Sequence, residues 1–343
     1  MKYQIKETDS EKLLRSEVVN YNFDKKTGFM MTWGKTLEND PDLSPFGNFI
    51  LDMEISTICK QNCKFCYKAN TPNGKNMTFD TFKIILDKIL ESNKCLTQIA
   101  FGSGATGEEN PDTWKIMDYC REKGIIPNIT IANITDETAD KLVNRCGAVA
   151  VSRYENKNMC YDSVKKLTDR GLTQTNIHQL ICEETYDQAI ETISNIKTDD
   201  RLKYLNAIVF LSLKQKGRAE TGFTPLSQDK YKILIDKCFE SKINFGFDSC
   251  GAMRFSDAIK DRKNKDQLNK MIEPCESGCF SFYINVDGEG FPCSFTDGYE
   301  TWETGINIIN CNDFVKDVWN NQRMIEFRNK LIKCKRNCIL YTI

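Results

Sequence analysis

Three cysteines in one short segment are the residues of this sequence best suited to redox chemistry. Cys59, Cys63 and Cys66 stand in the run ICKQNCKFCY. Thiolates at these spacings on one tight loop can bind three irons of a [4Fe–4S] cluster. The next cysteine is Cys95, so the fourth iron is left for a ligand that this loop does not supply. A lone triple fits zinc poorly, because structural zinc sites usually have four protein ligands in two closely spaced pairs.

The spacing resembles the C-x3-C-x-φ-C signature of the radical S-adenosylmethionine (SAM) enzymes, with Phe65 at the aromatic position. The resemblance implies that Cys59, Cys63 and Cys66 hold the catalytic cluster, whose open iron binds the amino and carboxylate groups of SAM. It places Phe65 near the adenine. It also implies reductive cleavage of SAM to a 5′-deoxyadenosyl radical that abstracts hydrogen from a substrate C–H bond. The electron donor that the resemblance implies is a flavodoxin- or ferredoxin-type protein.

A glycine-rich segment, FGSGATGEENPD, is expected beside the cysteine loop. Glycines let the backbone approach a ligand closely. Radical SAM enzymes commonly have a GGEP-like run here that contacts the amino group of SAM. This chain departs from that run, because its Gly-Glu pair is displaced toward Pro111. We expect a contribution to SAM binding from Gly102, Ser103, Gly104 and Glu108, and a plain glycine-rich turn is the alternative.

Polar residues at the ends of two further predicted strands are candidates for the same site. Ser152 stands where the radical SAM family often has a SAM-contacting serine, and Arg153 has the geometry to pair with the SAM carboxylate. A surface ion pair is the alternative for Arg153. Asn176 and His178 lie on one side of their strand, because side chains alternate between its faces, and either would line the cofactor-binding interior. The alternative for the lone histidine is a structural role.

Cationic residues follow the next predicted strand. Lys214 and Arg218, with Gly217 between them, are weaker candidates for holding a substrate carboxylate or phosphate.

The C-terminal cysteines form a second constellation. Cys279-x8-Gly288-x4-Cys293 resembles the opening of the SPASM and Twitch extensions of radical SAM enzymes, which bind auxiliary [4Fe–4S] clusters. The pair Cys334-x3-Cys338 resembles their closing cysteines. Too few cysteines are available for the two clusters of a full SPASM domain, so we expect one auxiliary cluster, and a zinc site is the alternative. The ligand candidates are Cys275, Cys279, Cys293, Cys334 and Cys338, with Cys250 and Cys311 as reserves; Cys275 and Cys279 compete for one place.

Short apolar runs alternate with amphipathic helices between residues 49 and 250. This alternation predicts parallel strands joined by helices, and Thr78 is the expected N-cap of the first helix. The resemblance favours an α/β fold of the partial (β/α)6 TIM-like barrel type, and an open doubly wound sheet is the alternative. The expected strands are 49–55, 96–101, 126–132, 148–152, 174–181, 207–213 and 243–248.

The domain organisation expected from these patterns has three parts. Residues 1–48 show little periodicity and form an N-terminal segment leading into the barrel. Residues 49–250 form the radical SAM core. Residues 251–343 form a small cysteine-rich extension, with a hairpin at Asp287-Gly288 and a final helix over about 313–331.

Composition narrows the range of partners. The 343 residues carry a net charge of −1 without long blocks of one sign, which favours neither nucleic acid nor a membrane surface as a partner. The N-terminus lacks the apolar core of a signal peptide, and the most apolar stretch is too short to span a membrane. Sixteen cysteines without an export signal indicate reduced thiols, so we expect a cytoplasmic protein.

Two substrate classes follow from the resemblance. Radical SAM enzymes with such extensions often modify ribosomally made peptides or proteins by crosslinking, oxidation or epimerisation, and this is our first expectation. The second is a small molecule such as a nucleoside, sugar or cofactor precursor, because no peptide-recognition domain is evident in the first fifty residues. A cysteine-rich zinc-binding module is the third reading, of another class.

Overall fold

The largest sheet is built from parallel strands that follow one another in chain order. The computed structural model describes residues 2–343. From β5 to β11 every neighbouring pair is parallel and the order never reverses. A doubly wound sheet would reverse its order at a switch point, so the predicted partial barrel is confirmed. Its strands are β5 (Ile50–Ser56), β6 (Gln98–Ser103), β7 (Ile126–Ile131), β8 (Val149–Ser152), β9 (Thr175–Ile181), β10 (Ala207–Ser212) and β11 (Phe245–Phe247).

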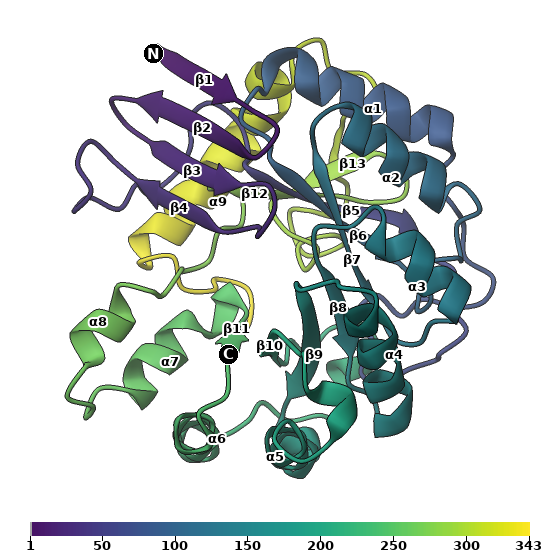
Figure 1. Ribbon diagram of the computed structural model, residues 1–343. Coiled ribbons are helices and arrows are strands. Elements are labelled where there is room, and N and C mark those ends of the chain that lie inside the picture. The colour runs from purple at the N-terminus through teal and green to yellow at the C-terminus, as the bar shows by residue number, and fades with distance from the viewer. Residues whose placement is uncertain (1) are drawn as a thin grey trace.

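Six helices follow the strands around the outer side of this sheet (Figure 1). Thr78 caps the first of them as predicted, because its side chain accepts a hydrogen bond from the Thr81 amide. Phe82, Ile85 and Ile89 form the buried face of that helix. The helices are α1 (Phe79–Ser92), α2 (Thr113–Glu122), α3 (Asp136–Val143), α4 (Lys157–Asp169), α5 (Tyr186–Asn195) and α6 (Gln228–Ser241). Short 3-10 turns are η1 (Glu183–Thr185), η2 (Asp200–Leu202), η3 (Gly217–Glu220) and η4 (Ser249–Gly251).

The two faces of β5 differ in chemistry. Leu51, Met53 and Ile55 alternate along one face and are buried in the main hydrophobic core. Asp52 and Glu54 lie on the opposite face, which looks into the barrel. The barrel interior therefore offers polar groups, while the apolar face of the strand packs against the helices.

The C-terminal region extends the same sheet. β12 runs parallel to β5, and β13 and β14 continue the sheet in antiparallel fashion. The predicted hairpin is confirmed, and Gly288 adopts the positive φ of 77° that its turn requires. The final helix begins later than predicted, after a separate π-helix. The elements are α7 (Ala252–Ala258), α8 (Lys265–Asn269), β12 (Ser281–Ile284), β13 (Glu289–Phe291), β14 (Ile306–Asn307), a π-helix (Phe314–Trp319) and α9 (Gln322–Lys333).

The N-terminal residues form a separate four-stranded antiparallel sheet that the sequence pattern did not reveal. Tyr21 Oη donates to the carbonyl of Cys95 at 3.0 Å, and Lys12 Nζ donates to the carbonyl of Leu96 at 2.8 Å. Both acceptors precede β6, so this sheet lies at the amino ends of the barrel strands. Its strands are β1 (Tyr3–Glu7), β2 (Glu11–Ser16), β3 (Asn20–Asp24) and β4 (Met30–Trp33). None of the helices within residues 2–343 is both long and apolar enough to cross a membrane.

Candidate active site

The cysteine loop begins directly after β5, at the carboxyl end of the parallel strands. The Cys59 amide donates to the carbonyl of Thr71 at 2.9 Å, and the Cys66 amide donates to the carbonyl of Cys63 at 3.2 Å. These bonds close the loop and leave all three cysteines half-buried. In a barrel of this kind, the carboxyl ends of the strands are the usual place for an active site.

The thiols of the cysteine loop are close enough to shift one another's pKa values. Burial is the main cause that raises the pKa of Cys59 and Cys63, and the neighbouring thiols raise it further. Neighbouring thiolates repel until a cation binds them, so this loop suits a metal cluster. Within residues 2–343, no three His, Cys, Asp or Glu side chains gather tightly enough to hold a single ion. A cubane cluster makes a different demand, because each thiolate binds its own iron.

The cysteine loop is held by the segment that follows β10. Arg218 Nε donates to the carbonyl of Cys63 at 2.8 Å, and its backbone amide donates to the carbonyl of Cys66 at 3.0 Å. Its Nη1 donates to the carbonyl of Asn70 at 3.0 Å. The guanidinium that we considered for a substrate anion is thus already bonded to the cysteine loop.

The glycine-rich loop approaches the cysteine loop closely. Gly104 has a φ of 61°, and a Cβ at this position would lie 2.5 Å from the carbonyl oxygen of Ile58. Ser103 is buried, and its Oγ has no hydrogen-bond partner within the described residues. The exposed Gly102 precedes them on β6. This loop therefore brings its backbone and the unpaired Ser103 hydroxyl close to the cysteine loop, as expected for a SAM-binding segment.

Glu108 and Glu109, the two glutamates of this loop, have different bonding partners. The Glu109 carboxylate accepts from the amides of Ala105 at 2.8 Å and Thr106 at 3.0 Å. Its charge also raises the pKa of Cys59, after burial. Glu108 is exposed and lies 3.6 Å from Lys141. The structure thus places Glu109, which the sequence analysis passed over, nearer to the cluster loop than Glu108.

At the end of β8, a tyrosine rather than an arginine faces the cysteines. Burial is the main cause that raises the pKa of Tyr154; the nearby Cys63 thiol raises it further, and the neighbouring Ser152 side chain lowers it. The rings of Phe65 and Tyr154 lie 5.6 Å apart. Arg153 is only 3% exposed and donates to the Glu191 carboxylate at 3.0 Å, on α5. Phe65 and Tyr154 therefore lie together near Cys63, whereas the guanidinium of Arg153 bonds to an outer helix.

Asn176 and His178 share the face of β9 that looks into the barrel. His178 stands level with Ser152 on β8 and with Val209 on β10. Burial lowers the pKa of His178 to about 4, so its imidazole is neutral at pH 7. Burial also raises the pKa of Asp52 on β5 to about 6. At pH 7 the interior below the cysteine loop therefore combines a neutral imidazole with the Asp52 carboxylate, which is mostly ionised.

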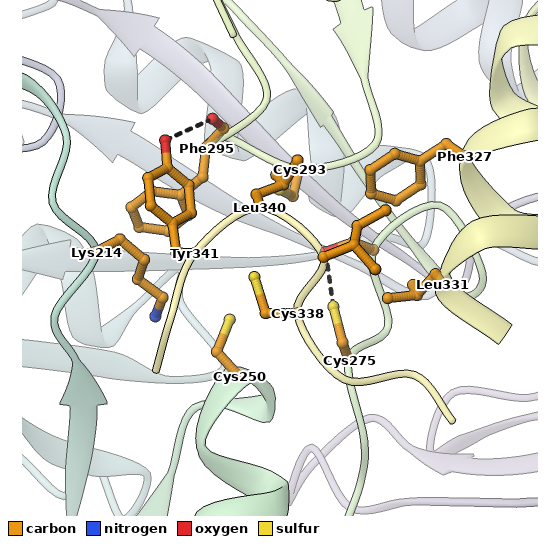
Figure 2. A pocket seen from close by; sticks show the side chains of 12 residues that line it. Lys214, Cys250, Cys275, Cys293, Phe295, Phe327, Leu331, Cys338, Leu340 and Tyr341 are labelled. Carbon is orange, nitrogen blue, oxygen red and sulfur yellow. Dashed lines mark hydrogen bonds between the residues drawn. The ribbon is translucent and has the colours of Figure 1, made fainter. Parts of the chain in front are cut away.

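Four other cysteines surround one hollow in the C-terminal region (Figure 2). Aromatic and aliphatic side chains, among them Phe295 and Leu331, complete its wall. Four thiols are the number that a [4Fe–4S] cluster requires. We call this hollow the auxiliary cavity; its cysteines are Cys250, Cys275, Cys293 and Cys338.

The ligand candidates from the sequence divide into two groups. Cys275, Cys293 and Cys338 line the auxiliary cavity, and Cys250, a reserve candidate, is the fourth. Cys279 is buried elsewhere, where its carbonyl accepts from the Ser44 amide. Cys334 is exposed at the end of α9, and the carbonyl of Cys311 accepts from Lys88. One signal pointed to Cys250, because it follows a predicted barrel strand, at the rim that carries the first cysteine loop.

The cysteine loop and the auxiliary cavity are joined by polar contacts. The Tyr67 hydroxyl donates to Ser294 Oγ at 3.2 Å, so the residues next to Cys66 and Cys293 meet. Lys68 Nζ bonds to Tyr283 Oη at 2.7 Å and to Asp297 Oδ2 at 2.8 Å. The two thiol sites are thus parts of one connected structure.

Comparison with known proteins agrees with this architecture. Residues 275–339 match the SPASM family, an iron-sulfur cluster-binding domain. No curated protein matches the sequence. The chain is similar to Streptococcus suis SuiB bound to precursor peptide SuiA, with a TM-score of 0.69 and 14% identity over 97% of this chain and 93% of that chain. SuiB bound to S-adenosylmethionine gives a TM-score of 0.61 and 15% identity, over 82% of this chain and 68% of that chain.

A second protein of known structure has the same fold. Native anSMEcpe with bound AdoMet and Cp18Cys peptide has a TM-score of 0.57 and 18% identity, over 84% of this chain and 86% of that chain. At such identities the likeness concerns the fold. The predicted partial-barrel fold with a SPASM-type iron-sulfur extension is confirmed.

Proposed function

We propose that this chain is a radical SAM enzyme, in which Cys59, Cys63 and Cys66 hold the cluster that binds SAM. The observation that carries the proposal is the closed loop of three half-buried thiols at the carboxyl ends of the parallel strands. When bound there, the cluster and SAM together supply a 5′-deoxyadenosyl radical that removes hydrogen from a substrate C–H bond. The protein's own groups bind SAM, orient the substrate and shield the radical from water.

The residues around the loop have distinct tasks in this proposal. The unpaired Ser103 hydroxyl and the backbone of Gly102 and Gly104 bind the polar groups of SAM. Phe65 and Tyr154 form an aromatic wall beside Cys63 for the adenine. We assign Arg153 the task of supporting this wall, since its guanidinium donates to the backbone carbonyl of Tyr154 and to the Glu191 carboxylate. Water must be kept from the radical, and in this proposal the barrel interior provides that shielding.

The barrel interior receives the substrate. Asn176 and His178 face it from β9, and the neutral imidazole can donate or accept a hydrogen bond without adding charge. Arg218 keeps the cysteine loop in place through three hydrogen bonds to backbone oxygens.

The auxiliary cavity holds one further [4Fe–4S] cluster in this proposal. Its ligands are Cys250, Cys275, Cys293 and Cys338, since the four surround one hollow and the last three lie within the region that matches an iron-sulfur domain. Cys275 Sγ bonds to Ser277 Oγ at 3.2 Å, which orients this ligand. Cys279 and Cys334 are not assigned as ligands.

The proposed substrate is a peptide or protein, which the enzyme would crosslink, oxidise or epimerise. Support comes from two proteins of the same fold that are described with peptides, SuiB with SuiA and anSMEcpe with Cp18Cys. An external protein of the flavodoxin or ferredoxin type would supply the electron.

Formation of 5′-deoxyadenosine tests the catalytic proposal. The anaerobically reconstituted, dithionite-reduced protein should convert SAM to 5′-deoxyadenosine and methionine. The triple variant with Cys59→Ala, Cys63→Ala and Cys66→Ala should form none. Cys160→Ala is the matched control, because this thiol is buried in α4 away from both sites. A wild type that carries its clusters and forms no 5′-deoxyadenosine would contradict the proposal.

A further inference from the structure

A buried lysine from the barrel reaches the auxiliary cavity. Lys214 follows β10 and is only 6% exposed. It lines the auxiliary cavity together with Cys250, and Figure 2 shows its ammonium end beside that cysteine. Its Nζ lies 5.0 Å from the ring centroid of Phe295, the second residue after Cys293. A full positive charge thus stands at the edge of the proposed cluster site.

An acidic partner holds this charge in place. Lys214 Nζ forms an ion pair with Asp248 Oδ2. The Asp248 carboxylate also accepts from the Ser212 amide and Oγ, each at 3.1 Å, and from the Gly251 amide at 3.2 Å. Asp248 and Gly251 flank Cys250 in the chain, so the ion pair is rigidly tied to a ligand. The pair therefore presents a fixed dipole to the auxiliary cavity, with the ammonium lining it.

Charge near a redox centre changes its reduction potential. Reduction adds one negative charge, which a nearby ammonium stabilises and a nearby carboxylate destabilises. Such interactions are strong where water is excluded, because the effective dielectric constant is low. Potentials of iron-sulfur clusters respond to local charge and hydrogen bonding around their sulfurs.

We propose that Lys214 and Asp248 are positioning residues that set the reduction potential of the auxiliary cluster, with the ammonium raising it. This inference rests on the proposed function, because it needs a cluster at Cys250, Cys275, Cys293 and Cys338. The lysine belongs to the barrel, whereas three of the four proposed cluster ligands belong to the extension. The strand that lines the substrate site thereby also determines how readily the auxiliary cluster accepts an electron.

A redox titration followed by electron paramagnetic resonance tests this inference. The full-length chain with Cys59→Ala, Cys63→Ala and Cys66→Ala is used, so that only the auxiliary cluster is titrated. Lys214→Met should lower the potential, with a fall of about tenfold or more in the equilibrium constant for reduction, or 59 mV for one electron. Asp248→Asn should shift the potential in the opposite direction, because it leaves the ammonium uncompensated.

Two further variants separate charge from packing. Lys214→Arg keeps the charge and should keep a potential near that of the wild type. Lys12→Met removes another buried ammonium, 5% exposed and paired with Glu7 at 3.5 Å, at the other end of the barrel, and should leave the potential unchanged. Shifts of equal sign in Lys214→Met and Asp248→Asn would overturn the inference, since they indicate loosened packing.

The outcomes distinguish this inference from the proposed function. If the parent chain of this titration binds no iron, the auxiliary cluster itself is wrong. If it binds iron and the potentials of Lys214→Met and Asp248→Asn do not move apart, only the role of the charge pair is wrong. Should Lys214→Met fail to hold its cluster, Asp248→Asn decides the question alone.

Discussion

Among single residues, burial has the largest effect on the protonation of the Cys59 and Cys63 thiols. Burial raises the pKa of Cys59 and Cys63, so both are protonated at neutral pH when no metal is bound. Metal binding must then displace these protons, which couples cluster assembly to pH. The loop is held in shape by Arg218, so the thiols do not need the cluster to stay close together.

The single histidine gives a direct test of the barrel interior. Burial lowers the pKa of His178 to about 4, against about 6.5 in an unfolded chain. The unfolded chain therefore binds a proton between these values that the folded protein does not bind. As pH falls from 6.5 through 4, this residue should cost the fold up to about 3 kcal/mol.

Nuclear magnetic resonance can measure that pKa without ambiguity. The chain has one histidine, so labelled histidine gives one imidazole signal. Its titration should have a midpoint near pH 4, and His178→Asn should reduce the loss of stability over the same pH range. A midpoint near 6.5 would mean that the imidazole is solvated and does not line a closed interior.

Residue identities were predicted unevenly from the sequence. The cysteine triple was evident, because its ligands are neighbours in the chain. Cys250 ranked below Cys279 and Cys334, since spacing along the chain does not show which distant thiols converge. Tyr154 was missed because a tyrosine after a strand has no distinctive spacing. Its contact with Cys63 depends on how two loops from different strands meet.

At the scale of elements, the segment that follows β10 packs tightly against the cysteine loop. Gly217 has a φ of 61°, and a Cβ there would lie 2.4 Å from the carbonyl oxygen of Tyr67. Gly222, in the same segment, has a φ of 78° with nothing within 4 Å of its Cβ position. The two glycines thus share backbone strain and differ in contact with the loop.

This pair predicts a difference between two alanine variants. Both should lose about 1–2 kcal/mol of stability, because a positive φ disfavours a side chain. Only Gly217→Ala should also push the cysteine loop away, and it should lose iron from the first cluster to a chelator much faster than Gly222→Ala. The measurement is the rate of iron release beside the melting temperature. Equal rates would contradict the close packing of the two segments.

Regular elements were easier to predict than their pairing. Strands and helices of the barrel were found because apolar runs and amphipathic periods are local signals. The four strands within residues 3–33 were missed, since they are short and show little regular alternation of apolar and polar residues. Their sheet gains its stability from contacts with the barrel, such as that of Tyr21 with Cys95, which no local pattern records.

Considering the whole molecule, one continuous sheet links the barrel to the iron-sulfur extension. β12 lies parallel to β5, the strand that leads into the cysteine loop. The C-terminal region is therefore not a loosely attached module, and the polar contacts of Tyr67 and Lys68 connect the two thiol sites. The sequence predicted both parts, but their common sheet was not predictable, because strand partners distant in the chain are chosen by tertiary packing.

Iron and sulfide content after anaerobic reconstitution tests the central claim most directly. Three chains are compared with the wild type. One has Cys59, Cys63 and Cys66 replaced by alanine, and the second has Cys250, Cys275, Cys293 and Cys338 replaced. The matched control carries Cys279→Ala and Cys334→Ala.

The account predicts about eight irons in the wild type and the control, and about four in each of the other two variants. Zinc without iron in the wild type would contradict the account entirely. A control that falls to about four irons, with about eight retained when the four cavity cysteines are replaced, would contradict the assignment of the auxiliary cavity.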